Sequence, residues 1–162
     1  MSTFSFTTPD LSDDHPQCEV LPFQFLHFGT VACFAGPAAT VFCDEDNSRV
    51  AEAVASAGEG RVLVIDGQQS LRRSLLGDNL AKKAIHNHWA GVIVLGAIRD
   101  VEIIDTLSLG VFALGVVPIK TEKRGLGQRD VELTLGGINV VPGNWIYADR
   151  NGVLVAPHPV HQ

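Results

Sequence analysis

The feature that most constrains this sequence is an alternation of helix-like segments and short apolar runs between residues 46 and 116. The apolar runs span residues 61–65, 91–95 and 111–116. The helix-like segments, which repeat apolar residues at helical spacing, span residues 46–58, 78–88 and 100–107. Short runs that are apolar on both faces are typical of buried strands. Their alternation with helices predicts an α/β fold with a parallel central sheet and crossover helices.

The pattern changes after Pro118. Residues 120–130 form a charged loop that contains glycine, and several short β-like runs follow it. These runs span residues 131–135, 138–141, 145–148 and 153–156. They predict a second, mixed or antiparallel β layer. Upstream, residues 31–43 resemble two β runs broken at Gly36-Pro37, because proline cannot donate to a sheet ladder.

Neither a linker nor a repeat divides the 162 residues, so we expect one domain over 1–162, with an N-terminal arm at 1–28 and a tail at 158–162. Hydrophobic residues make up 46% and charged residues 19%, a balance that excludes intrinsic disorder. The longest apolar stretch, residues 109–119, is too short for a membrane span. The N-terminus has no signal-like apolar segment, so we expect a cytoplasmic protein.

Charge and cysteine content narrow the class of protein further. The net charge is −6 and the pI is about 5.4, which argues against direct nucleic-acid binding through a basic face. Cys18, Cys33 and Cys43 form no CxxC pair. We expect these cysteines to be reduced thiols that fill buried space.

Chain reversal predicts that three charged residues lie near one another. A helix that begins at Asp78 and the strand that follows it run in opposite directions, so the chain returns to the edge where the helix began. Arg99 and Asp100 should therefore lie beside Asp78, next to the loop at residues 67–77. The carboxyl ends of parallel strands are where open α/β sheets place ligand sites.

These residue types suit a small keto acid bound together with a metal. Two carboxylates can hold a hard divalent cation through oxygen. Arg99 can bind a substrate carboxylate and neutralise charge that develops during a reaction. The amides that begin the helix can receive an anion. The structural alternative is that Asp78 and Asp100 only cap helices, and that Arg99 is a solvated residue after a strand.

Several motifs, in order, resemble one protein family over nearly the whole chain. GDNL at residues 77–80 precedes Arg99-Asp100, with 20 residues between Asp78 and Arg99. This spacing resembles the D-x20-R-D motif of the 4-hydroxy-4-methyl-2-oxoglutarate aldolases and their RraA-like relatives (RraA is regulator of ribonuclease activity A). The further segments that resemble the family are HFGTVACFAG, RVLVIDGQQSLRRSLLGDNLA, WAGVIVLGAIRDV, PIKTEKRGLGQRDV, LGGINVVPGNWIYAD and NGVLVAP.

The resemblance implies a three-layer β/β/α fold of the swivelling type, assembled as a homotrimer or a dimer of trimers, with the site between neighbouring subunits. It implies that Asp100 is the direct ligand of a divalent metal, magnesium or manganese, and that Arg99 is the catalytic residue. The substrate-binding residues that it implies are Arg99 with Gly77, Asp78, Asn79 and Leu80. Asp78 would reach the metal through water.

The resemblance also implies two reactions on small 2-keto diacids. They are cleavage of 4-hydroxy-4-methyl-2-oxoglutarate to two pyruvates and decarboxylation of oxaloacetate. Both pass through a pyruvate enolate, toward which a metal acts as Lewis acid and Arg99 supplies fixed positive charge. Aldol cleavage also needs a base at the C4 hydroxyl, and the sequence assigns none. The alternative, from another class, is a protein-interaction module that inhibits an endoribonuclease.

One segment departs from the family pattern. Many relatives read DGGGS where this chain has DGQQS at residues 66–70, and the larger side chains are expected to reshape the mouth of the pocket. Two basic clusters, around Arg72 and at residues 120–129, are interpreted as solvated or intersubunit charge. The functional alternative is that Arg72 or Lys123 attracts an anionic substrate, or that the clusters meet a protein or RNA partner.

The histidines offer weaker candidates. His86 and His88 lie two residues apart on a predicted helix, so they point to different faces and cannot share a metal ion. His158 and His161 fall in the C-terminal tail, which we expect to be frayed.

Overall fold

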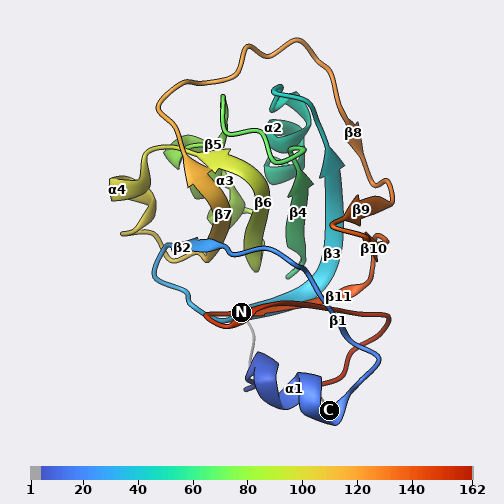
Figure 1. Ribbon diagram of the computed structural model, residues 1–162. Helices are drawn as coiled ribbons and strands as arrows, with labels where there is room; N and C mark the ends of the chain where they lie inside the picture. Colours follow the sequence, from blue (N-terminus) through green and yellow to red (C-terminus); the bar gives the residue numbers. More distant parts are fainter. Residues whose placement is uncertain (1–4, 162) are drawn as a thin grey trace.

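The computed structural model describes residues 5–161, which form a curved mixed sheet with helices against it (Figure 1). The helices of this part of the chain are α1 (Thr8–Asp14), α2 (Ser48–Val54), α3 (Asp78–His86) and α4 (Val101–Ile104). Its strands are β1 (Glu19–Val20), β2 (Leu26–Phe28), β3 (Phe34–Phe42), β4 (Val62–Asp66), β5 (Ser74–Leu76), β6 (Gly91–Ile98), β7 (Val111–Val116), β8 (Gln128–Arg129), β9 (Leu133–Leu135), β10 (Ile138–Val140), β11 (Trp145–Asp149) and β12 (Gly152–Ala156). Within these residues, no helix has the length and apolar character that a membrane crossing requires.

The central strands run parallel in the order β3-β4-β6-β7, and β2 adds an antiparallel edge beside β7. In the chain, α2 lies between β3 and β4, α3 between β5 and β6, and α4 between β6 and β7. Each of these helices therefore connects parallel strands as a crossover. Strand β6 is buried along its whole length, which explains its continuous apolar sequence. The predicted α/β fold with a parallel central sheet is confirmed.

Alternate residues of the central strands face two separate cores. The core on the helix side includes Val50, Val54, Ala84 and Ile104 from the helices and Leu63, Ile65, Val92 and Val94 from the sheet. The core on the opposite face includes Val62, Val64, Ile93 and Phe112 from the sheet and Leu133, Leu135, Val140 and Ile146 from the C-terminal strands. β9 pairs antiparallel with β10, and β11 with β12, as predicted for the C-terminal strands.

Strand β3 corrects the expectation of two β runs broken at Gly36-Pro37, because it continues through both residues. Its first half pairs antiparallel with β11, as far as Pro37 opposite Trp145. From Ala38, which lies opposite Val62, its second half pairs parallel with β4. Proline is tolerated because its missing N–H falls where the strand changes neighbours.

The loop expected over residues 67–77 contains a short strand, β5, which pairs in parallel with the end of β6. β6 therefore continues past Gly96, where we expected it to end, as far as Ile98. Three residues are too few to show a periodic pattern, so the sequence did not reveal β5. Because of this extension, Arg99 and Asp100 follow β6 directly.

Both ends of the described chain pack on the C-terminal strands. β1, in the N-terminal arm, pairs antiparallel with β12. Thr8 donates from its amide and its hydroxyl to the Asp149 carboxylate, at 2.8 and 2.7 Å. The Val160 amide donates to the Tyr147 hydroxyl at 2.8 Å, and that hydroxyl is hydrogen-bonded to Nδ1 of His161 at 2.7 Å. The tail is therefore held in place at Val160 and His161, where we expected fraying.

Candidate active site

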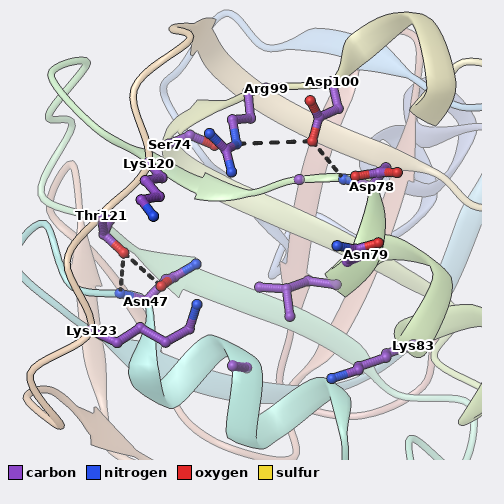
Figure 2. Close-up of a pocket in the computed structure, with 13 residues that line it drawn as sticks. Asn47, Ser74, Asp78, Asn79, Lys83, Arg99, Asp100, Lys120, Thr121 and Lys123 are labelled. Carbon is purple, nitrogen blue, oxygen red and sulfur yellow. Dashed lines mark hydrogen bonds and ion pairs between the residues drawn. The ribbon is translucent and has the colours of Figure 1, made fainter.

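The end of β6 and the start of α3 meet at one edge of the sheet (Figure 2). The Arg99 amide donates to the carbonyl of Leu76 at 3.0 Å. The Asp78 amide donates to Oδ2 of Asp100 at 3.2 Å, and Nε of Arg99 lies 3.9 Å from the same oxygen. The predicted proximity of Asp78, Arg99 and Asp100 is confirmed.

Capping of the helix that follows does not account for either aspartate side chain, although the Asp100 carboxylate accepts a hydrogen bond from the first amide of α3. Asp78 is the first residue of α3, and Gly77 occupies the N-cap position. Asp100 precedes α4 with φ 59° and ψ 37°, in the left-handed region, and its side chain makes no cap hydrogen bond. This conformation costs a non-glycine residue roughly 1–2 kcal/mol. Strain of this kind is typical of functional positions that the surrounding structure holds in place.

Gly77 is required by the close approach of the site residues and not by its backbone angles, since its φ of −122° suits any residue. A Cβ atom at this position would lie 2.7 Å from Oδ2 of Asp100 and 3.6 Å from Nε of Arg99. The first of these contacts is too close for a carbon atom. A side chain at position 77 would therefore displace the Asp100 carboxylate from the start of α3.

The Asp78 carboxyl is held in its ionised form. Burial by itself would raise the pKa of Asp78, but hydrogen bonding within the site and the nearby Lys82 ammonium outweigh burial and lower that pKa. Nζ of Lys82 lies 3.4 Å from Oδ2 of Asp78, in an i,i+4 pair along α3. The site thus gathers two acidic side chains beside one guanidinium.

A cavity of about 300 Å³ opens beside these groups. Its lining residues are Asn47, Ala51, Ser74, Gly77, Asp78, Asn79, Leu80, Lys83, Arg99, Asp100, Lys120, Thr121 and Lys123. All of the predicted substrate-binding residues are therefore in its wall. The volume lies at the lower end of the range for small-molecule sites, which suits a compact organic acid.

Asn47 and Thr121 are buried polar residues of this wall that the sequence did not reveal as site residues. Asn47 has the sequence position of a cap for α2, but its side chain makes no cap hydrogen bond. Its amide group donates to the Leu75 carbonyl at 3.2 Å, and its Oδ1 accepts from the Thr121 hydroxyl at 2.6 Å. Asn47 thus ties α2, β5 and the loop after β7 together around the cavity.

The donor set fits a hard divalent cation with an incomplete protein shell. Asp100 and Asp78 supply carboxylate oxygens at the cavity wall, and residues 5–161 contain no cluster of three or more His, Cys, Asp or Glu side chains. Magnesium is commonly bound through one or two carboxylates, with water and substrate oxygens completing its octahedron. The residues present therefore suit magnesium or manganese better than a metal that needs a complete protein cage.

Of the other candidate residues, only Lys123 lines the cavity. Arg72 forms an ion pair with Glu45 and does not line the cavity, whereas Lys123 does. His86 ends α3, and His88 is exposed beyond it, so neither contributes to the cavity.

The DGQQS segment also lies apart from the cavity, which corrects the expectation that it reshapes the pocket mouth. Gln68 and Gln69 have φ of 57° and 62°, in the left-handed region that favours glycine. The Gln68 side chain donates to the Cys43 carbonyl at 3.1 Å. The glycines of the DGGGS pattern thus coincide with backbone positions that glycine adopts more easily.

The fold and site define a class of α/β protein that gathers an arginine, two carboxylates and a helix N-terminus at the carboxyl end of its strands. The RraA-like family profile, described as Aldolase/RraA, matches residues 8–155. The chain belongs to this RraA-like family.

Similar proteins carry different functional names. A Xanthomonas campestris pv. campestris (strain 8004) protein named "Putative 4-hydroxy-4-methyl-2-oxoglutarate aldolase" is 51% identical over 156 residues, which are 96% of this chain and 94% of that protein. The structure of the RNA-processing inhibitor RraA from Thermus thermophilis has a TM-score of 0.93 and 44% identity, covering 96% of this chain and 95% of that one. A structure named S-adenosylmethionine:2-dimethylmenaquinone methyltransferase, from Geobacillus kaustophilus HTA426, has a TM-score of 0.93 and 43% identity, covering 96% and 97%. Because one fold carries several names, function has to be argued from the site.

Proposed function

We propose that this protein is a divalent-metal-dependent lyase of small 2-keto diacids. In this proposal it cleaves 4-hydroxy-4-methyl-2-oxoglutarate to two pyruvates and decarboxylates oxaloacetate. The observation that carries the proposal is the junction at which Asp78, Arg99 and Asp100 meet at the wall of one cavity. The names of relatives about half identical to this chain support the aldolase reaction.

Arg99 binds and orients the pyruvyl part of the substrate. Nη1 of its guanidinium donates to the Pro118 carbonyl at 3.3 Å, which fixes the group against the loop after β7. Its side chain is 38% exposed, so guanidinium N–H groups remain accessible from the cavity. A planar guanidinium matches the geometry of a carboxylate, and the positive end of the α3 dipole adds to the attraction.

Asp100 is the residue that would hold the divalent cation, with Asp78 contributing through water. When bound there, the cation supplies Lewis acidity toward the keto oxygen of the substrate. Asp78 is anionic at neutral pH, as a partner of metal-bound water must be, and the lowering of its pKa keeps it so in more acid solution.

Both reactions break the C3–C4 bond of the substrate. In oxaloacetate, carbon dioxide leaves, the bonding electron pair forms the enolate of pyruvate, and a proton then adds at C3. In 4-hydroxy-4-methyl-2-oxoglutarate, the C4 hydroxyl loses its proton as the bond breaks, which releases one pyruvate and leaves the same enolate. Arg99 stabilises the negative charge that develops on the C2 oxygen, and fixed charge of this kind is usually a large catalytic term.

A coupled assay of pyruvate formation from oxaloacetate with Mg²⁺ tests this function. We expect Arg99→Ala and Asp100→Asn to reduce kcat/KM by about 100-fold or more, as loss of a preorganised charge does elsewhere. Circular dichroism establishes that the variants are folded. Equal rates in the wild type and both variants would contradict the proposal.

We also propose that the protein assembles as a homotrimer or a dimer of trimers. A second cavity of about 310 Å³ adjoins Arg99 and Asp100, and its wall includes Val101, Val116 and Pro118. Val116 is 49% exposed and Ile103 is 42% exposed. An exposed apolar surface beside the site is a surface that a neighbouring subunit would cover. Light scattering coupled to size-exclusion chromatography measures the assembly, and a monomer at all concentrations would contradict it.

A second candidate function is inhibition of an endoribonuclease. It is favoured by the likeness to the Thermus RNA-processing inhibitor, which is 44% identical with a TM-score of 0.93. The test is an RNA-cleavage assay in which this protein is titrated against the endoribonuclease. Under this function the wild type and Asp100→Asn inhibit cleavage equally, and an inactive wild type would exclude it.

A further inference from the structure

Three lysines line the cavity in addition to Arg99. Lys83 projects from α3, while Lys120 and Lys123 project from the loop that follows β7 (Figure 2). In this view Arg99 and Asp100 lie at one side of the cavity, with Lys120 near Arg99, and Lys83 and Lys123 lie at the opposite side. The cavity therefore has cationic groups at both ends.

The loop that carries Lys123 is fixed by a buried carboxylate. Asp46 has no exposed surface and accepts hydrogen bonds from the amides of Arg124 and Leu126, at 2.8 and 3.3 Å. The same carboxylate accepts from the amide and hydroxyl of Ser48, at 2.9 and 2.6 Å. Burial by itself would raise the pKa of Asp46, but these hydrogen bonds lower it to about 2. The ionised carboxylate thus holds the loop against the start of α2.

Lys120 is fixed from the other side of the cavity. The amide of Ser74 donates to the Ile119 carbonyl at 2.7 Å, and Arg73 donates to the Lys120 carbonyl at 3.0 Å. The hydroxyl of Thr121, the residue after Lys120, donates the hydrogen bond to Asn47 described above. The backbone of both lysines is therefore preorganised, while their side chains remain free to reach a ligand.

These lysines have no acidic partner in residues 5–161. None of the ion pairs in that part of the chain includes Lys83, Lys120 or Lys123. The two carboxylates of the cavity wall already have cationic neighbours, since Asp78 pairs with Lys82 and Asp100 lies beside Arg99. The end of the cavity away from Asp100 therefore has an excess of positive charge.

We propose that Lys83 and Lys123 form a second anion subsite, which binds the distal carboxylate of the substrate while Arg99 holds its pyruvyl end. This inference rests on the proposed function and adds the residues that select a 2-keto diacid over a 2-keto monoacid. Ammonium groups bind carboxylates as point charges, so both lysines can adapt to diacids of different length. The distal carboxylate neutralises the unpaired lysine charge, which a monoacid leaves unbalanced.

Two probes of equal chain length test the subsite by titration calorimetry in the presence of Mg²⁺. They are 2-oxoglutarate, which has a distal carboxylate, and 2-oxopentanoate, which lacks one. We expect the wild type to bind 2-oxoglutarate at least about tenfold more tightly, the factor that one charged hydrogen bond supplies. Lys83→Met and Lys123→Met should each weaken the binding of 2-oxoglutarate by several-fold to about tenfold and change the binding of 2-oxopentanoate less than about twofold.

Arg124→Met is the matched control, because Arg124 belongs to the same loop but does not line the cavity. It should leave the binding of both probes unchanged. Equal wild-type affinity for the two probes, or parallel losses for both probes in the lysine variants, would overturn the subsite. Binding of the probes does not depend on turnover. A protein that discriminates between the probes but releases no pyruvate from oxaloacetate would keep the subsite and lose the lyase function.

Discussion

The amide of Asp78, at the start of α3, donates a hydrogen bond to the carboxylate of Asp100, which precedes α4. This contact joins two crossover connections that are separated in the chain by the whole of α3 and β6. It also fixes the carboxylate that the proposed function assigns to the metal. The position of Asp100 therefore depends on both its own strained backbone and the helix opposite.

The backbone of Asp100 separates the catalytic from the structural contribution of this residue. Asparagine tolerates the left-handed region and keeps an oxygen that can accept from the Asp78 amide, whereas alanine does neither. We expect the free energy of unfolding of Asp100→Asn to lie within about 0.5 kcal/mol of the wild-type value. That of Asp100→Ala should be lower by about 1–2 kcal/mol. Both variants should lose lyase activity. Urea denaturation measures the stabilities, and an active Asp100→Asn variant would contradict the assigned role.

Substitution of Gly77 should damage the site without unfolding the protein. In Gly77→Ala, the new methyl group would meet Oδ2 of Asp100 at 2.7 Å, so the carboxylate has to move. We expect kcat/KM for oxaloacetate to fall by about tenfold or more, because small misplacements of catalytic groups are costly. The melting temperature should change little, since a φ of −122° suits alanine. Unchanged kinetics would show that Asp100 need not occupy this position.

The strained glutamines offer a stabilising substitution. Gln69 has φ of 62°, and its side chain does not line the cavity. Gln69→Gly should raise the free energy of unfolding by about 0.5–1 kcal/mol, because relief of left-handed strain exceeds the entropy that glycine adds to the unfolded chain. Gln68→Gly should raise the free energy of unfolding by less, because this variant also loses the side-chain hydrogen bond to the Cys43 carbonyl. Urea titration of the two variants checks this order, and a destabilised Gln69→Gly would contradict it.

Asp46 should make stability depend on pH in the acid range. Its pKa is lowered from 3.8 to about 2 in the folded protein, so the unfolded chain binds more protons between these values. The stabilisation is therefore complete above about pH 5 and is lost as the pH falls from about 4 toward 2. The Asp46→Asn variant should lack this pH-dependent stabilisation. Denaturation of the wild type and variant from pH 3 to 6 measures the difference.

The control for this experiment is Asp13→Asn, on the exposed side of α1, which should follow the pH dependence of the wild type. Because Asp46 also holds the loop that carries Lys123, Asp46→Asn should weaken the binding of 2-oxoglutarate more than the binding of 2-oxopentanoate at neutral pH. An identical acid dependence in Asp46→Asn and the wild type would contradict the assignment.

Local periodicity was enough to predict the central sheet. β4, β7 and the first part of β6 appear in the sequence as apolar runs because both of their faces are buried. The meeting of Asp78 and Arg99 followed from the reversal of the chain between α3 and β6. Neither inference needed contacts between distant parts of the sequence.

The other wall of the cavity could not be predicted in this way. Asn47 and Thr121 are 74 positions apart and meet through side-chain hydrogen bonds that leave no periodic trace. The Asp46 carboxylate similarly binds amides 78 and 80 positions away. Lys123 was noted from its charge, but nothing in the local sequence distinguished it from Arg124, which does not line the cavity.

The change of neighbours along β3 affects the order in which the protein can form during synthesis. The half of β3 that pairs with β4 has its partner soon after it is made, whereas the half that includes Phe34 pairs with β11, close to the C-terminus. A nascent chain must therefore leave this half of β3 without its strand partner until translation is nearly finished. Such late, non-local pairing slows folding and leaves the emerging polypeptide open to aggregation or to chaperone binding.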